Sequence, residues 1–332
     1  MSRKTILLLN PSGRLPYTRD YFCSKVTKTG YIEHPVDLLI LSGILYQHHS
    51  LILIDAIAQN LDFENCYQKI CALNIDAIIF LAGCVSWKDD FEFLKKIKAA
   101  KPQVLFIGIG DIFKKENIFR ENAWIDANLK DFTSHDIVEY LEGKNSAFLD
   151  LAYRKNGSLV IPPERKNENS KILFEVPIPR HEMFLKNSYT FPFVKNLPYT
   201  TVLTDYGCGF NCAYCIYSSF GFKMRALQNV YEELEYIHSL GIKELFVKDQ
   251  TFAFDRKRGI ELCREMIRKK WGFSWTCFLR ANVVTVELLS LMKEAGCHTA
   301  SFGVESGNDE ILRIYRTGVD KERIKKALLS RI

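Results

Sequence analysis

Residues 206–215 read YGCGFNCAYC, and this stretch places Cys208, Cys212 and Cys215 within eight residues. A disulfide uses two cysteines, and a structural zinc site usually takes four ligands. Three closely spaced thiols fit neither arrangement. In an iron–sulfur cube, four irons usually take four thiolates, so three cysteines would leave one iron open to a small molecule. Gly207 and Gly209 are expected to give the backbone room to approach such a cluster.

The stretch stands at the start of a series of strand–helix units in the second half of the chain. Apolar runs predict strands at 200–207, 243–252, 273–282 and 298–306. Helical periodicity predicts helices at 224–241, 259–270, 286–296, 308–316 and 321–332. No antiparallel pairing is predicted here, so we expect a partial (β/α) barrel of about four units with parallel strands.

Functional residues of such barrels lie at the carboxyl ends of the strands. Beside the cysteines, these ends carry Asp249, Gln250, Arg280, Asn282 and Glu305. Polar side chains that end otherwise apolar strands are difficult to explain as core. We therefore take them as candidate binding residues, and no residue is assigned a catalytic role.

The first half also alternates apolar runs with amphipathic segments, which predicts a doubly wound, flavodoxin-like α/β domain with a parallel sheet. Strands are expected at 5–9, 51–58, 75–83, 104–110 and 123–128. Ligands of such folds bind beyond the carboxyl ends of the strands. The sequence has there Asn10, Pro11, Asp55, Ala56, Gly83, Ser86, Gly108 and Gly110. Alternatively, the glycines only make tight strand-to-helix turns, and GIGDIF at 108–113 lacks the third glycine of a dinucleotide fingerprint.

The alternation stops between residues 144 and 199, where a polar, proline-bearing segment precedes an extended, aromatic-rich one. We therefore predict a doubly wound domain at 1–143, a linker and extended connection at 144–199, and the partial barrel at 200–332.

Composition describes an ordinary globular chain of 332 residues with a net charge of +6. Its basic residues are scattered, which favours solvated helix faces over a nucleic-acid surface. The sequence has neither a long apolar run nor a cleavable leader, so we expect a cytoplasmic protein without a membrane span. The remaining cysteines are expected to be reduced, buried apolar residues, namely Cys23, Cys66, Cys71, Cys84, Cys263, Cys277 and Cys297.

The C-x3-C-x2-C spacing, with Tyr214 before the last cysteine, resembles the radical S-adenosylmethionine (SAM) superfamily. The resemblance implies that Cys208, Cys212 and Cys215 hold a 4Fe-4S cluster whose open iron binds SAM. It further implies SAM contacts from the residues that follow the strands, which are Tyr214, Asp249 or Gln250, Arg280, Asn282 and Glu305. The alternative is a zinc site that takes a distant fourth ligand from Cys263, Cys277 or His238.

Barrels of this superfamily have six strand–helix units, and only about four fit between residue 200 and residue 332. The sequence therefore suggests either a truncated form or a partner that supplies the missing wall.

The first half resembles the cobalamin-binding members of the superfamily. LIDAIAQNL at 53–61 is similar to their second-strand signature, and GCVSW and GIGDIF fall where their ring- and tail-contacting loops lie. The resemblance implies that the eight residues at the strand ends contact cobalamin. Ile57 stands where other cobalamin proteins have histidine, which implies an unligated or weakly ligated lower face of cobalt.

Together the resemblances imply a cobalamin-dependent radical SAM enzyme. The expected reaction is methyl transfer to an unactivated carbon or phosphorus, through a 5′-deoxyadenosyl radical and methylcobalamin. One alternative is ring cyclisation or rearrangement without methylation, and another is a non-catalytic or defective cofactor-binding fragment. The expected partners are a small-molecule or peptide substrate and an electron donor such as flavodoxin or ferredoxin, with no nucleic acid and no membrane.

Overall fold

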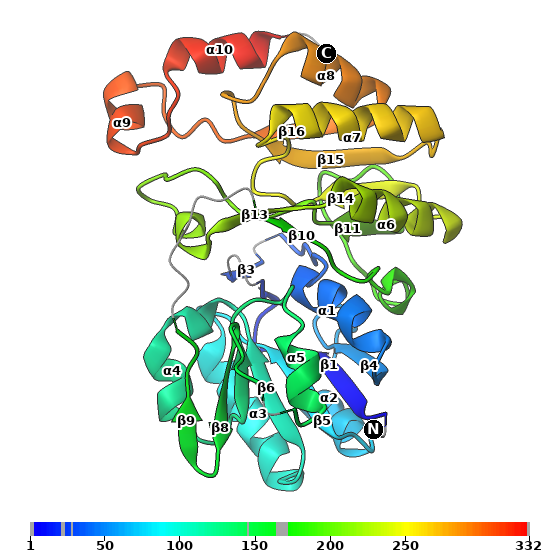
Figure 1. Ribbon diagram of the computed structural model, residues 1–332, viewed down its shortest axis with the longest axis vertical. Coiled ribbons are helices and arrows are strands. Elements are labelled where there is room, and N and C mark those ends of the chain that lie inside the picture. The colour runs from blue at the N-terminus through cyan, green and yellow to red at the C-terminus, as the bar shows by residue number, and fades with distance from the viewer. Residues whose placement is uncertain (1–2, 21–23, 28, 145, 164–171, 331–332) are drawn as a thin grey trace. The chain divides into compact units, whose positions relative to one another are not determined.

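The computed structural model describes residues 3–20, 24–27, 29–144, 146–163 and 172–330. The chain divides into two compact units. Unit 1 comprises Met1–Arg165 and Val176–Phe191, and unit 2 comprises Lys166–Glu175 and Pro192–Ile332. Each unit contains a sheet with parallel strands connected by helices (Figure 1), which confirms the predicted mixed α/β class.

Unit 1 is built on a seven-stranded sheet of order β4-β1-β5-β6-β7-β8-β9. Its parallel strands are β1 (Thr5–Asn10), β4 (Ser50–Asp55), β5 (Ala77–Leu81), β6 (Leu105–Ile109) and β7 (Ala127–Leu129). The helices of the unit are α1 (Val36–Tyr46), α2 (Phe63–Cys71), α3 (Trp87–Ala100), α4 (Glu116–Glu121) and α5 (Asp136–Leu141). Strand β1 is apolar and buried at consecutive positions because a parallel strand inside a helix-covered sheet is shielded on both faces.

A β-hairpin extends this sheet within the stretch that the sequence predicts as linker. β8 (Leu151–Lys155) pairs antiparallel with β7 and with β9 (Ser158–Val160). The hairpin turns at Asn156-Gly157, where both residues have positive φ (50° and 77°). Asn-Gly is a preferred pair for such a two-residue turn because both residues tolerate left-handed backbone. Residues 164–171 of the predicted linker lie outside the described residues.

The segment 176–191 packs against α1 of unit 1. A Cβ atom at Gly43 would lie 2.3 Å from the carbonyl oxygen of Pro177, so only glycine permits this approach. The Ser42 hydroxyl accepts a hydrogen bond from the Arg180 N–H at 2.9 Å, and Ile32 forms an isolated bridge with Thr190. Much of the extended connection is therefore part of the first unit's packing.

Unit 2 contains a four-stranded parallel sheet of order β11-β14-β15-β16 and a three-stranded sheet of order β10-β13-β12. The strands of the parallel sheet are β11 (Tyr199–Val202), β14 (Glu244–Val247), β15 (Ser274–Leu279) and β16 (Cys297–Phe302). The strands of the smaller sheet are β10 (Leu173–Phe174), β12 (Asp205–Gly207) and β13 (Phe222–Arg225). The α-helices are α6 (Leu227–Ser239), α7 (Arg256–Lys269), α8 (Val286–Glu294), α9 (Asp309–Ile314) and α10 (Lys321–Leu329).

The strand predicted at 200–207 is two strands. The buried carboxylate of Asp249 accepts hydrogen bonds from the N–H groups of Thr204 and Asp205, at 2.7 and 2.9 Å, and so interrupts the strand between β11 and β12. β12 then pairs antiparallel with β13, so the helix predicted from residue 224 begins only at Leu227. The prediction that this half has no antiparallel pairing is wrong at this point.

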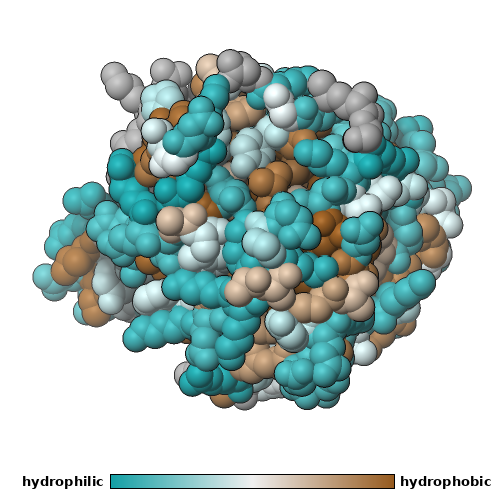
Figure 2. Space-filling model, turned by 90° about the horizontal axis from the view of Figure 1, so that it is seen from below, coloured by the Kyte–Doolittle hydropathy of each residue, from teal (hydrophilic) through white to brown (hydrophobic). Residues whose placement is uncertain are grey.

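The core of unit 1 joins the central strands to the helices that connect them, through residues such as Leu9, Phe80 and Phe106. Among the dispersed cysteines, Cys66, Cys263, Cys277 and Cys297 are buried as predicted, whereas Cys71 and Cys84 are partly exposed. Cys23 lies outside the described residues. On the face shown in Figure 2, hydrophilic residues surround scattered hydrophobic patches. No helix in the described part of the chain has the length and apolarity needed to cross a bilayer.

Candidate functional site

The cysteine loop leaves β12 through a glycine that no other residue could replace without rearrangement. Gly207 has φ 75°, and a Cβ atom there would lie 1.9 Å from the carbonyl oxygen of Gly221. The same carbonyl accepts a hydrogen bond from the Cys208 N–H at 3.3 Å. The loop is therefore closed by direct backbone contact between its two ends.

Gly209 makes room for an aromatic wedge from the loop that follows β14. A Cβ atom at Gly209 would lie 2.2 Å from the ring of Phe254. That ring packs against Phe210 and Phe222, with centroid distances of 4.9 and 4.5 Å. We expected the glycines to admit a cluster, but in this structure the space beside their α-carbons is filled by the chain itself.

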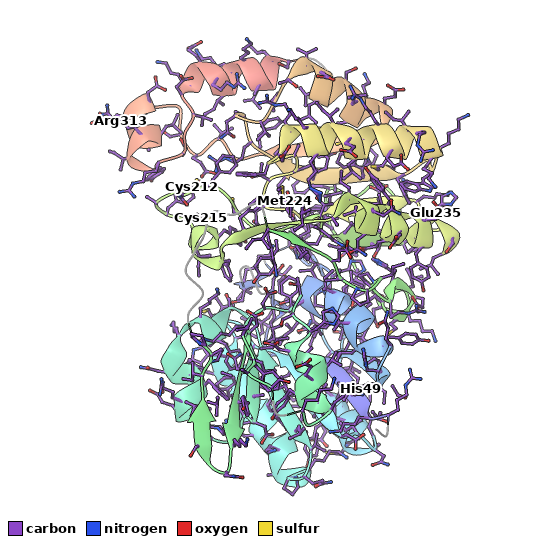
Figure 3. The ribbon with its side chains drawn as sticks, viewed as in Figure 1. His49, Cys212, Cys215, Met224, Glu235 and Arg313 are labelled. Carbon is purple, nitrogen blue, oxygen red and sulfur yellow. The ribbon has the colours of Figure 1, made fainter. Side chains whose placement is uncertain are left out.

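The three thiols of the loop differ in burial, and Cys208 and Cys215 are partly exposed. Cys212 is buried, and its carbonyl accepts a hydrogen bond from the Cys215 N–H at 3.1 Å, which makes a tight turn. Figure 3 labels the two cysteines. Burial raises the pKa of the Cys208 and Cys215 thiols, because desolvation of the thiolates outweighs the opposing effect of the nearby Arg280 guanidinium.

Among the described residues, no three His, Cys, Asp or Glu side chains are placed to hold a single metal ion. A mononuclear zinc site with a distant fourth ligand is therefore not formed here. The arrangement is compatible with a cube, because each thiolate of a cube binds a separate iron and the sulfur atoms stay apart. The donor set of three thiols without a fourth cysteine fits a cluster with one open iron.

Arg280, which directly follows β15, contacts the cysteine loop. Its Nη1 donates to Cys212 Sγ at 3.0 Å, and Nη2 donates to the carbonyl oxygen of Thr317. Its guanidinium also lies over the Phe210 ring, 4.1 Å from the centroid. The predicted site residue Arg280 therefore meets the predicted cluster ligands in this structure.

The segment after α9 also supports the loop, and sequence reasoning missed it. The Tyr315 carbonyl accepts a hydrogen bond from the Ala213 N–H at 2.9 Å. The ring of Tyr315 packs edge-on against that of Tyr214 at a centroid distance of 5.1 Å. Tyr315 and Thr317 lie about a hundred residues after the cysteines, so no local spacing could have indicated this contact.

Tyr214 and Glu305, which are both predicted to contact SAM, lie close together. Burial and a hydrogen bond with the Glu305 carboxylate raise the pKa of the Tyr214 hydroxyl, although half of the side chain remains exposed (50%). Glu305 is exposed and has a φ of 63°, a strained value for a non-glycine residue. Strain of this kind is concentrated at functional sites, so it supports a role for Glu305.

Asp249 and Gln250 are adjacent in the sequence but differ in burial. Asp249 is 1% exposed, and its carboxylate accepts from the backbone of Thr204 and Asp205 and from the Thr204 hydroxyl. In this structure Asp249 thus stabilises the β11–β12 connection and offers no oxygen to a ligand. Gln250 is only partly buried and is the member of the pair that a ligand could reach.

Asn282 has a buried side-chain oxygen without a hydrogen-bond partner in the described structure. Its backbone carbonyl accepts from Arg256 and Arg323 at 3.4 Å. A buried amide oxygen that lacks a partner costs free energy, and such atoms call for an unseen water or ligand. Asn282 therefore remains a candidate ligand contact.

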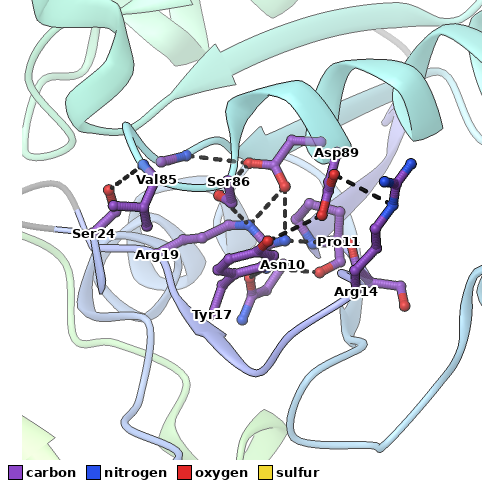
Figure 4. Close-up of polar contacts among 12 residues, drawn as sticks. Asn10, Pro11, Arg14, Tyr17, Arg19, Ser24, Val85, Ser86 and Asp89 are labelled. Atoms are coloured by element: carbon purple, nitrogen blue, oxygen red, sulfur yellow. Dashed lines mark hydrogen bonds and ion pairs between the residues drawn. The ribbon is translucent and has the colours of Figure 1, made fainter. Parts of the chain in front are cut away.

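In unit 1, the predicted ligand residues are part of a buried network around Arg19 (Figure 4). The Arg19 guanidinium donates to Asn10 Oδ1 at 3.0 Å and to the Pro11 carbonyl at 2.8 Å. It also pairs with Asp90 Oδ1 at 2.7 Å and donates to Ser86 Oγ at 3.2 Å. Asn10, Pro11 and Ser86 therefore hold the segment that carries Arg19 over the sheet edge.

Asp55 continues this network on the other side of Asn10. Its carboxylate accepts from Asn10 Nδ2 at 2.8 Å and from the Tyr189 hydroxyl at 2.9 Å. Burial raises the pKa of Asp55, which is fully enclosed together with the neighbouring Ala56. Tyr189 stacks on His34, with ring centroids 3.9 Å apart.

The predicted ligand-facing glycines of unit 1 are also packed against their own chain. A Cβ atom would lie 2.5 Å from Ser24 at Gly83, 2.3 Å from the Phe113 ring at Gly108, and 2.2 Å from the Ala82 carbonyl at Gly110. All eight residues predicted to contact cobalamin are thus buried and form the floor of this sheet edge. In the loop between β5 and α3, Val85 is exposed, with half of its side chain accessible (50%).

Comparison with known proteins finds a family to which the second half of the chain is similar. Residues 202–330 match the model of the radical SAM superfamily. The chain is 29% identical over 320 residues to an uncharacterized methyltransferase of Pyrococcus horikoshii, covering 93% of this chain and 68% of the relative. It is 23% identical over 304 residues to an anaerobic magnesium-protoporphyrin IX monomethyl ester cyclase of Rubrivivax gelatinosus, covering 84% of this chain and 52% of the relative.

A solved structure shares the fold of almost the whole chain. The radical SAM methyltransferase TsrM from Kitasatospora setae, with cobalamin and a [4Fe-4S] cluster bound, matches with a TM-score of 0.73 and 16% sequence identity. The match covers 99% of this chain and 67% of TsrM. The likeness in fold thus extends over both units of the chain, which spans between half and about two thirds of these relatives' length.

Proposed function

We propose that this chain, whose residues 202–330 are a radical SAM domain, is a cobalamin-dependent radical SAM methyltransferase. The observation that carries the proposal is the loop with Cys208, Cys212 and Cys215, a set of three closely spaced thiols that Gly221, Arg280 and Tyr315 hold by hydrogen bonds. When bound, the cluster and cobalamin would supply electron transfer to SAM and a transferable methyl group. The methyltransferase relative and the fold shared with TsrM support this reaction class.

Under this proposal the finer architecture follows the sequence prediction. Unit 1 corresponds to a flavodoxin-like cobalamin-binding domain, since its parallel strands have the order 2-1-3-4-5 when counted along the chain. The β11-β14-β15-β16 sheet corresponds to the first four strands of a partial barrel. The boundaries predicted at 1–143, 144–199 and 200–332 are part of the proposal, with segment 176–191 packing on the first unit.

The chain's own residues would divide the work as follows. The three thiols bind the cluster, and Tyr214 with Glu305 lies beside the last of them where SAM would have to enter. Gln250 and Asn282 offer amide groups at the ends of β14 and β15, and amides suit the amino and carboxylate groups of SAM. The methyl acceptor is proposed to be an unactivated carbon or phosphorus of a small molecule or peptide.

The proposed cobalamin site would use the exposed residues that lie on the buried residues at the sheet edge. Asn10, Asp55, Ser86 and the glycines fix the sheet edge, and ligand contacts would come from the exposed residues above them, such as Val85. The His34 imidazole stacks on Tyr189, whose hydroxyl donates to Asp55, and the proposal includes no protein ligand for cobalt at this position.

The test is anaerobic reconstitution of the chain with iron, sulfide and cobalamin, followed by EPR spectroscopy with and without SAM. We expect a reduced-cluster signal that changes on addition of SAM and a separate base-off Co(II) signal. A matched Cys208→Ala variant should lose the cluster signal and keep the cobalt signal. A wild-type chain that assembles no cluster, or that gives the same spectrum as Cys208→Ala, would contradict the proposal.

Ring cyclisation is a second candidate function, because the cyclase of Rubrivivax gelatinosus aligns with 84% of this chain. The two reactions differ in products. Methyl transfer from SAM leaves S-adenosylhomocysteine beside 5′-deoxyadenosine, whereas cyclisation without methylation leaves deoxyadenosine alone. Mass spectrometry of the reaction mixture distinguishes them once a substrate is supplied.

A further inference from the structure

The cluster loop has an arginine at its side that the general scheme does not require. Arg280 belongs to the connection after β15, and its guanidinium reaches Cys212, which lies 68 positions earlier in the chain. Cys212 is buried (6% exposed) and Arg280 is partly buried, so the N–H to sulfur contact of 3.0 Å is partly shielded from water. A charged hydrogen bond in such surroundings is stronger than one on the surface.

Three separate contacts fix the orientation of this guanidinium. One face lies over Phe210, 4.1 Å from the ring centroid, and one amino group donates to the Thr317 carbonyl. The remaining amino group is then directed at Cys212 Sγ. Because the planar fork is held by the ring and the carbonyl, the third donor is pre-organised and costs little further entropy.

The supports of Arg280 are themselves parts of the loop's brace. Phe210 lies between Cys208 and Cys212 and packs on Phe254, and Thr317 follows Tyr315, which accepts the Ala213 N–H. Arg280 therefore joins the cysteine loop to the segment after α9. A change in either would displace the cation from the sulfur atom.

We propose that Arg280 is a positioning residue that holds Cys212 in its ligating orientation and raises the reduction potential of the cluster. This inference rests on the proposed function, since it needs the cluster to be present. One-electron reduction by an external donor adds a negative charge to the unit of cluster and thiolates. A fixed cation that donates an N–H to a ligating sulfur stabilises the reduced form more than the oxidised form.

The direction of the expected shift in reduction potential follows from the charge of the residue. A second residue, with negative charge, should shift the potential in the opposite direction. The Glu305 carboxylate hydrogen-bonds Tyr214 and acts on Cys215 with the opposite charge, so it disfavours the reduced form of the cluster. Neutralising Glu305 should therefore shift the potential upward, while neutralising Arg280 shifts it downward. Two shifts of opposite sign are not produced by a general loosening of the loop.

The experiment is an EPR-monitored potentiometric titration of the reconstituted full chain without SAM, with dithionite as reductant. The variants are Arg280→Met, Arg280→Lys, Glu305→Gln, and Arg264→Met as a matched control, since Arg264 is exposed and pairs with Glu287 on the surface. Iron content and circular dichroism are measured for each. At the midpoint of the wild type, the ratio of reduced to oxidised cluster in Arg280→Met should fall about tenfold, which is about 59 mV for one electron.

Arg280→Lys should give a smaller shift in the same direction, because it keeps the charge and loses the planar fork. If Arg280→Met takes up no iron while Arg264→Met does, the positioning role is supported, and Arg280→Lys then reports the potential. A wild-type midpoint in the Arg280 variant that retains iron would overturn the inference and leave the proposed function intact. Failure of the wild type to assemble a cluster would instead contradict the proposed function.

Discussion

The buried ion pair between Arg19 and Asp90 gives the sharpest stability prediction for unit 1. Their side chains are 1% and 0% exposed, and the two are joined at 2.7 Å. Arg19→Met removes the cation and leaves the Asp90 carboxylate enclosed with Ser86 Oγ and the Gly83 N–H. Breaking a buried pair in this way costs about 3–5 kcal/mol, because the remaining charge is neither solvated nor paired.

Hydrogen exchange with mass spectrometry is the appropriate assay, because it reads β1 and α3 separately from unit 2. At about 1.4 kcal/mol per tenfold change, the protection of the β1 amides should fall about 10²- to 4 × 10³-fold. The exposed neighbour Arg14→Met is the control and should change protection by less than about tenfold, since it is paired on the surface. Arg19→Met with Asp90→Leu should recover most of the loss, because no charge then stays buried.

The penalty should also depend on pH. Burial raises the pKa of Asp90, while Arg19 pulls it down, so removing Arg19 raises it further. A group with a raised folded-state pKa loses stability as pH rises from its unfolded value, about 4, toward the folded value. Arg19→Met should therefore reduce the stability of unit 1 less at pH 5 than at pH 7. Protection within tenfold of wild type, or a double variant no more stable than Arg19→Met, would refute this account.

Three further predictions concern unit 2. Gly209→Ala should reduce iron uptake and destabilise the fold by about 1–3 kcal/mol, because its methyl group would meet the Phe254 ring. Adding Phe254→Leu should restore part of both. If neither substitution has an effect, the packing of Phe254 against Gly209 does not matter as we infer. Asp249→Ala should lower the melting temperature, because the buried N–H groups of Thr204 and Asp205 lose their acceptor. Gln250→Ala should leave the melting temperature unchanged and weaken SAM binding, measured by calorimetry. The reverse pattern would contradict the assignment of Asp249 to the fold and of Gln250 to the ligand. Burial opposes ionisation of Glu244, but its hydrogen bonds hold its pKa below the usual range. The stabilisation that Glu244 provides should therefore disappear as pH falls below about 4. In urea unfolding, Glu244→Gln should lose less stability between pH 5 and pH 3 than the wild type.

Local pattern predicted most of the parallel strands and their connecting helices, but it missed the β8–β9 hairpin and the β12–β13 pair. The alternation of apolar runs and amphipathic segments in each half predicted the mixed α/β class, because burial on both faces of a parallel strand gives a continuous apolar run. The spacing of Cys208, Cys212 and Cys215 placed them together at the end of a strand, since residues so close along the chain cannot be far apart in space. These features depend only on neighbours in the sequence.

Only the tertiary structure decided how the polar residues are used. Asp249 and Gln250 are adjacent and equally polar, yet one is buried against Thr204 and the other is partly exposed. Arg19 looked like any other charged residue, and its burial follows from a carboxylate on a distant helix.

The brace of the cysteine loop was equally invisible in the sequence. Its partners Arg280 and Thr317 stand 68 and more than a hundred positions beyond Cys212. The sequence thus determined which thiols could bind a cluster. The fold determined which cation faces them, because hydrogen bonds and desolvation depend on distances in space that chain order does not fix.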